Sequence, residues 1–94
     1  MRRIGELLPV KAIVTVTLKS GVLDPQGKAI EGALASLGFD GVDSVRQGKI
    51  FEIEVKESDP ARATAAISAM AEKLLANTVV ENYRVELVSG QDAT

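Results

Sequence analysis

The sequence contains no cysteine and no histidine, and these two absences exclude much catalytic chemistry. Without cysteine there can be no disulfide framework, no thiolate nucleophile and no cysteine zinc site. Without histidine the chain lacks the commonest general base and the commonest metal ligand, so a serine nucleophile would have no imidazole to activate it. A phosphate-binding loop of the G-x-x-x-x-G-K-[ST] type is also missing. The residues therefore predict a chain that performs no bond chemistry by itself.

An excess of positive charge and long apolar runs are missing as well. The net charge is −2, and Arg2-Arg3 is the only basic cluster, which disfavours a nucleic-acid surface. No apolar run approaches the roughly 20 residues that cross a bilayer. The apolar part of residues 1–9 is too short for a signal peptide. We therefore expect a cytoplasmic protein that binds neither membranes nor nucleic acid.

What the sequence does contain is enough apolar residues for one small domain. Hydrophobic residues make up 46% of the 94-residue chain, which is typical of a globular protein. We expect a single domain over residues 10–88, a flexible arm over 1–9 that ends at Pro9, and a disordered tail over 89–94. A chain of this size buries only about 60–65% of its unfolded surface, so oligomerisation would add useful burial.

Hydrophobic spacing predicts two similar strand–helix units. Strict alternation predicts a strand over residues 11–19, and a 3–4 spacing predicts a helix over 25–37 with one stripe facing a core. Asp24 falls at the N-cap of this helix and Pro25 at its first position, after a bend at Gly21. Asp59-Pro60 repeats the arrangement before a second helix over 60–76. The stripe expected to face inward on that helix is Ala63, Ala66, Ile67, Met70 and Leu74, and Asn77 is expected to end it in the left-handed conformation.

Residues 42–57 predict a hairpin, and residues 81–88 predict a last strand. The hairpin would join a weak strand around 42–46 to a clear one over 50–57, with Gly48 at the turn in a left-handed conformation. The resulting order, β-α-β-β-α-β, predicts an α+β, ferredoxin-like two-layer sandwich with two helices on one face of an antiparallel sheet. The other face is polar but contains Ile13, Ile50 and Val88, so we expect it to meet water or a second copy.

Gly27 is the residue that local structure explains least. It lies in the first turn of the first predicted helix, where alanine would be better by roughly 1 kcal/mol. One hypothesis is that residues 20–28 approach the backbone of a partner chain so closely that no Cβ fits. The alternative is that this turn simply tolerates glycine.

Four blocks of sequence, read in order, resemble the PurS family. They are residues 21–30 (GVLDPQGKAI), 34–39 (LASLGF), 45–49 (VRQGK) and 73–77 (KLLAN), the last continued by 81–86 (ENYRVE). The resemblance covers about residues 11–88, and four blocks at the family's spacing are much more specific than DPQG alone. PurS is the small subunit of the multi-chain phosphoribosylformylglycinamidine synthase of purine biosynthesis. That ligase uses glutamine and ATP to convert formylglycinamide ribonucleotide (FGAR) to formylglycinamidine ribonucleotide (FGAM).

The resemblance implies a non-catalytic subunit that bridges a glutaminase subunit and a large synthetase subunit and supports ammonia transfer. It also implies that this chain binds no cofactor and that the synthetase uses ATP and Mg²⁺. Together with the mixed sheet face, it leads us to expect a homodimer or a dimer of dimers. The candidate partner-contact residues are Gly21, Asp24, Pro25, Gln26, Gly27, Lys28, Arg46 and Lys49.

Two other classes share the same element order. The ligand loop of an ACT-like small-ligand regulatory module is not matched here, and this module is kept as the alternative. An RNA-recognition domain would need aromatic side chains on the exposed sheet face, whereas Phe51 and Tyr83 both fall at inward positions.

Overall fold

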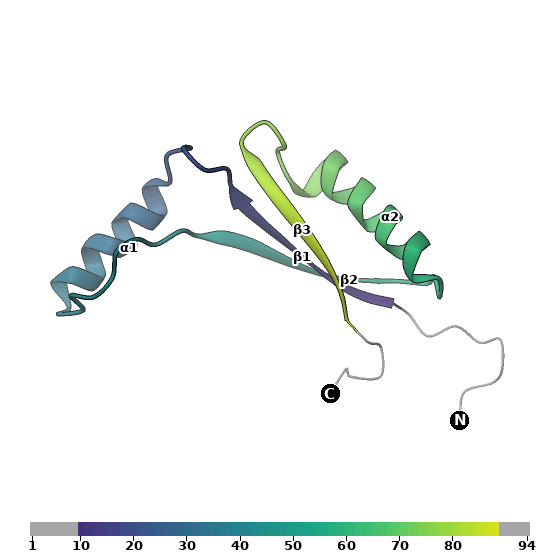
Figure 1. The fold of residues 1–94 in the computed structure, drawn as a ribbon, viewed down its shortest axis with the longest axis horizontal. Coiled ribbons are helices and arrows are strands. Elements are labelled where there is room, and N and C mark those ends of the chain that lie inside the picture. The colour runs from purple at the N-terminus through teal and green to yellow at the C-terminus, as the bar shows by residue number, and fades with distance from the viewer. Residues whose placement is uncertain (1–9, 89–94) are drawn as a thin grey trace, which may run out of the picture.

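A computed structural model describes residues 10–88 of the chain (Figure 1). In chain order the elements are β1 (Val10–Leu18), α1 (Pro25–Ser36), β2 (Gly48–Val55), α2 (Pro60–Met70), the π-helical turn η1 (Ala71–Leu75) and β3 (Glu81–Val88). The arm expected over 1–9 and the tail expected over 89–94 lie outside the described residues.

The three strands form one antiparallel sheet in the order β2-β1-β3. In its register, Val14 of the central strand is opposite Phe51 on one side and Val85 on the other. Because side chains alternate along a strand, these three apolar residues share one face of the sheet. The predicted α+β class, with an antiparallel sheet and two helices, is confirmed.

The core lies between this face and α2, which packs against β1 and β3. Ala12, Val14 and Val16 of the central strand are fully or almost fully buried, as the alternation predicts. From α2, Ile67 is buried against them, and Ala63 is also fully buried. The small alanine side chain lets the helix backbone approach the sheet closely.

The end of the second helix differs from the prediction because η1 is a π-helical turn, in which each hydrogen bond spans five residues where an α-helix spans four. The N–H of Ala76 donates to the carbonyl of Ala71, five residues earlier, at 2.9 Å. This π-turn places Ala71 and Ala76 in the core, whereas Leu74 is 83% exposed. The predicted inward stripe is therefore wrong at Ala66, Met70 and Leu74, which are all exposed. Asn77 is not left-handed, because no non-glycine residue in the described part of the chain has a positive φ.

The predicted hairpin over residues 42–57 does not form. Residues 42–47 belong to no strand, and Gly48, expected at a turn with positive φ, is instead the first residue of β2. A Cβ on Gly48 would lie 2.5 Å from the carbonyl oxygen of Val16, so the two strands can approach there only because position 48 has no side chain. Within residues 10–88 the sheet consequently has three strands, where the element order had suggested four.

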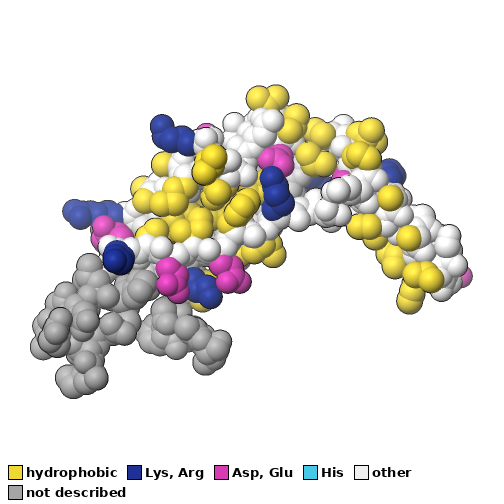
Figure 2. All heavy atoms as spheres, turned by 180° about the vertical axis from the view of Figure 1, so that it is seen from behind, with side chains coloured by type: hydrophobic (Ala, Val, Ile, Leu, Met, Phe, Trp, Pro, Cys, Tyr) yellow, Lys and Arg dark blue, Asp and Glu magenta, His cyan; other side chains and the backbone are white. Residues whose placement is uncertain are grey.

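Helix α1 lies beyond the end of the sheet, whereas it was expected to lie on the sheet face (Figure 1). The molecule accordingly extends over 57 × 31 × 14 Å. The stripe predicted to face the core is largely uncovered, with Leu37 73% exposed and Ile30 38% exposed. Figure 2 shows hydrophobic side chains at the surface both over the sheet and along the projecting helix.

The sheet face opposite α2 is mixed, as predicted. Ile13 and Ile50 share it, since the register places Thr15 opposite Ile50. Charged residues surround them, including the ion pair between Lys11 and Glu52 at 3.7 Å. Neither helix in residues 10–88 has the length and apolar character needed to span a bilayer.

Candidate functional site

The candidate site begins at the turn from β1 into α1, where the backbone conformation follows directly from the residues. Gly21 has φ of 87°, a left-handed conformation that glycine adopts without strain. Asp24 is the N-cap, and its Oδ1 accepts the N–H of Gly27 at 2.9 Å. Pro25 follows at the first helical position, where its missing N–H costs nothing. The predicted cap and bend are confirmed.

The same carboxylate also holds the chain that returns from α1 toward the sheet, the return segment (residues 42–47). Asp24 Oδ2 accepts the main-chain N–H of Gln47 at 3.0 Å. Two turns further along the helix, Glu31 Oε2 accepts the N–H of Val45 at 2.8 Å. Side chains of the helix thus satisfy main-chain donors that a hairpin partner would otherwise have satisfied.

Gly27 is where the helix and the return segment lie closest. It is buried, and an added Cβ would overlap the carbonyl oxygen of Val45 and lie 2.7 Å from Asp24 Oδ2. The predicted close approach of backbone to Gly27 is therefore present, but the approaching backbone belongs to the same chain. No partner chain is needed to explain the glycine.

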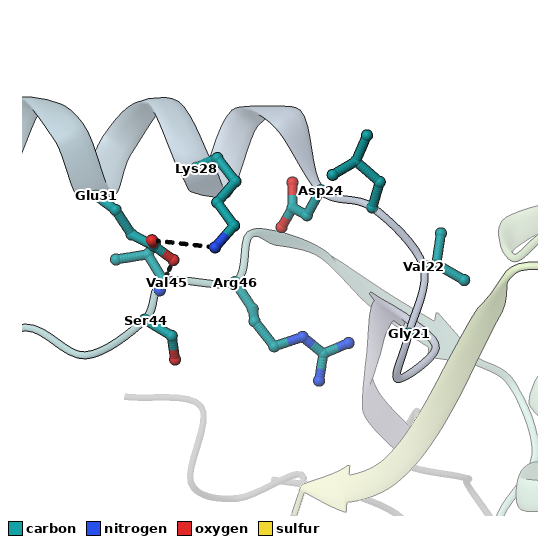
Figure 3. A pocket seen from close by; sticks show the side chains of 9 residues that line it. Gly21, Val22, Asp24, Lys28, Glu31, Ser44, Val45 and Arg46 are labelled. Carbon is teal, nitrogen blue, oxygen red and sulfur yellow. Dashed lines mark hydrogen bonds and ion pairs between the residues drawn. The ribbon is translucent and has the colours of Figure 1, made fainter.

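A shallow pocket of about 380 Å³ opens between the turn, the first turns of α1 and the return segment (Figure 3). Val22, Leu23 and Val45 supply its apolar lining. The charged and polar side chains at its edge are Asp24, Lys28, Glu31, Ser44 and Arg46.

Most of the predicted contact residues meet around this pocket. Gly21, Asp24, Lys28 and Arg46 line it. The side chain of Gln26 beside it accepts a hydrogen bond from the Gln47 side chain at 2.6 Å. Lys49 does not join them, since it lies on β2 and pairs with Glu81 at 3.6 Å. Pro25 is exposed at the start of the helix.

Sequence reasoning missed Glu31 and Gln47, which fix the return segment. Glu31 is absent from the candidate contact residues that the sequence suggested. Its spacing of seven from Asp24 places both carboxylates on the same side of α1, and this was the available signal. The pairing partners, however, lie in a segment that was expected to form a strand.

The electrostatics of the site are dominated by the two carboxylates. Hydrogen bonds from the N–H groups of Gln47 and Gly27, with a further contribution from the positive charge of Arg46, lower the pKa of Asp24 below its ordinary value of 3.8. Lys28 pairs with Glu31 at 3.5 Å. Among the described residues no cluster of three or more acidic groups is arranged to hold a metal ion.

Taken together, the fold defines a class: a small, elongated α+β protein that exposes apolar side chains and a shallow pocket, as subunits that bind other chains do. Comparison with known proteins then identifies the family. Residues 11–89 match the PurS family model, described as phosphoribosylformylglycinamidine (FGAM) synthase. The chain belongs to the PurS family.

Individual relatives are similar in sequence to this chain over most of their length. The phosphoribosylformylglycinamidine synthase subunit PurS of Bacillus subtilis is 47% identical over 77 residues, covering 82% of this chain and 90% of that protein. The PurS subunit of Synechocystis is 44% identical over 80 residues, covering 85% and 80%.

Solved structures confirm the fold. The B. subtilis PurS structure matches with a TM-score of 0.75 at 46% identity, covering 84% of this chain and 98% of that one. A chain in the structure of PurLQS from Thermotoga maritima matches with a TM-score of 0.79 at 32% identity, covering 85% and 98%. PurS proteins are therefore subunits of a ligase, and at least one has been solved within a larger assembly.

Two glycines of α1 provide a matched test of the contact between the helix and the return segment. Gly27→Ala should destabilise the protein by about 1–3 kcal/mol, because the new methyl group overlaps the Val45 carbonyl. Gly32→Ala has no heavy atom within 4 Å of its Cβ and should stabilise the helix by up to about 1 kcal/mol. Urea unfolding measures both. Equal stabilisation by the two substitutions would contradict the proposed contact.

The two hydrogen bonds that the Asp24 carboxylate accepts, from the N–H groups of Gly27 and Gln47, should make the stability of the protein depend on pH in a predictable direction. Because the folded state lowers the pKa of Asp24 below 3.8, its stabilisation is complete above that pH and is lost as the pH falls below it. The difference in melting temperature between wild type and Asp24→Ala should therefore shrink on acidification. Asp24→Asn keeps one acceptor oxygen but no charge, so its melting temperature should lie between the two above pH 3.8. If the difference in melting temperature stays constant down to low pH, the charge of Asp24 does not stabilise the fold.

Proposed function

We propose that this chain is the non-catalytic bridging subunit of phosphoribosylformylglycinamidine synthase in de novo purine biosynthesis. In this role it holds a glutaminase subunit and the large synthetase subunit together, so that ammonia released from glutamine reaches the ATP-dependent step that forms FGAM from FGAR. ATP and Mg²⁺ bind the synthetase, this chain binds no cofactor, and the complex works in the cytoplasm.

The observation that carries this proposal is the match to PurS over residues 11–89, together with the similarity to a chain of PurLQS. The family match favours this role over the ACT-like alternative. The absence of histidine and cysteine from the sequence supports it too, since glutaminase and ligase chemistry would then require other chains.

The candidate contact surface is the part of the molecule around the pocket. Gly21, Asp24, Gln26, Lys28 and Arg46 lie there, on the turn, the first turn of α1 and the return segment, which the Asp24 and Glu31 carboxylates hold together. A surface fixed before binding loses little conformational entropy when a partner docks.

Reconstitution with purified glutaminase and synthetase subunits of the same organism tests the role. Glutamine-dependent FGAM formation should require this chain, whereas ammonia-dependent formation by the synthetase should proceed without it. The purified chain alone should neither deamidate glutamine nor hydrolyse ATP. Full glutamine-dependent activity in its absence would refute the bridging role.

We further propose that the chain assembles as a homodimer or a dimer of dimers. The exposed side of α1, with Ile30 and Leu37, is an apolar stripe with nothing to cover it within the described chain. On the sheet, α2 packs against β1 and β3, while Phe51 and Ile53 of β2 remain half-buried beside it. The stripe of one copy would cover the β2 side of another, and burying both apolar surfaces would drive the association.

The oligomeric state can be tested with one charge placed on or off the stripe. Light scattering after gel filtration should give a multiple of the 9.9 kDa chain mass for the wild type. Leu37→Glu should lower the mass, because the interface would then bury an unpaired charge. Ser36→Glu, one residue away on a different side of the helix, should leave it unchanged. A monomeric wild type at micromolar concentration would contradict the proposal.

A further inference from the structure

Beside α1, the pocket at the start of the helix contains a charge arrangement that points to a particular kind of ligand group. Its two acidic side chains are already engaged. Asp24 accepts main-chain N–H groups with both oxygens, and Glu31 accepts the N–H of Val45 and pairs with Lys28. Arg46 has no hydrogen bond or ion pair through its guanidinium within residues 10–88.

The surroundings of Arg46 favour a single negative charge on an apolar stem. Its guanidinium extends from the return segment into the open space next to Gly21 and Val22 (Figure 3). The apolar lining of Val22, Leu23 and Val45 suits methylene groups, and the planar guanidinium suits a carboxylate. A dianionic phosphate fits less well, because the carboxylates of Asp24 and Glu31 line the same pocket and would repel it.

We propose that this pocket receives an acidic side chain, aspartate or glutamate, from a loop of another subunit of the complex, with Arg46 as its ion-pair partner. This inference rests on the proposed function and adds to it the chemistry by which one partner is recognised. The carboxylate loses water on entering the pocket and gains a charge-assisted pair of hydrogen bonds from the guanidinium.

The position of the pocket on α1 distinguishes this partner from a second copy of the chain. Ile30, Ala33 and Leu37 follow one another along one side of the helix. Lys28 and Glu31, which line the pocket, lie on nearly the opposite side. A homo-oligomer built on the apolar stripe would therefore leave the pocket open to a different chain.

The test is a titration of the chain into fixed amounts of the glutaminase and synthetase subunits, following glutamine-dependent FGAM formation. Arg46→Ala should raise the half-saturating concentration of the chain about tenfold, which corresponds to roughly 1.4 kcal/mol, and leave the rate at saturation unchanged. Arg46→Lys keeps the charge without the planar fork and should give an intermediate increase. Added salt should raise half-saturation more for wild type than for Arg46→Ala.

Arg62→Ala is the matched control, since Arg62 is an exposed arginine on α2 paired with Asp59 at 3.7 Å and should not change half-saturation. Thermal unfolding should show that every variant keeps its fold, because the Arg46 side chain is exposed.

Several results would overturn the inference. They are a half-saturation for Arg46→Ala within about twofold of wild type, a lower rate at saturation, a change in oligomeric mass, and Arg46-dependent binding of inorganic phosphate by the isolated chain. The change in mass would assign the pocket to a second copy, and phosphate binding would assign it to a free anion. Failure of the wild type to support glutamine-dependent activity would instead refute the proposed function, so the two failures can be told apart.

Discussion

The carboxylate of Asp24 is the group on which the arrangement of the first half of the molecule depends. Its Oδ1 caps the first turn of α1 by accepting the N–H of Gly27. Its Oδ2 accepts the N–H of Gln47, in the segment that returns from the far end of the helix. No strand of residues 10–88 pairs with the return segment, and its N–H groups at Val45 and Gln47 instead bond to the carboxylates of Glu31 and Asp24. Because Gly27 has no side chain, the two backbones can lie close enough for these bonds to form.

These hydrogen bonds hold α1 against its return segment, beyond the end of the sheet. The helix and its return segment form a unit with its own hydrogen bonds, and this unit uses only one side of the helix. The apolar stripe on another side is left at the surface, as is part of the apolar face of β2. A single chain thus exposes surfaces that a closed two-layer sandwich would have buried against each other.

Much of this structure follows from the sequence alone. Alternation and helical spacing predicted β1, α1 and β3 within one or two residues, and the Asp-Pro caps predicted where both helices begin. The spacing of apolar residues shows that α1 has an apolar side, but it does not show whether the same chain or another chain covers that side. The position of α1 was therefore not predicted. The strand predicted over residues 42–46 does not form, because whether such a segment pairs with a strand or with helix side chains depends on tertiary contacts. Of the residues that the sequence suggested as partner contacts, Gly21, Asp24, Lys28 and Arg46 line one pocket, whereas Lys49 lies elsewhere.

The two connections of α1 to the sheet have a mechanical consequence. The turn before the helix leads into β1, and the return segment leads into β2, while β1 and β2 pair along eight positions. A load applied to α1 by a bound chain would therefore reach two hydrogen-bonded strands at once, and their shared ladder would resist shear between them. Among the described elements α2 packs against β1 and β3, so such a load would reach that helix through the sheet.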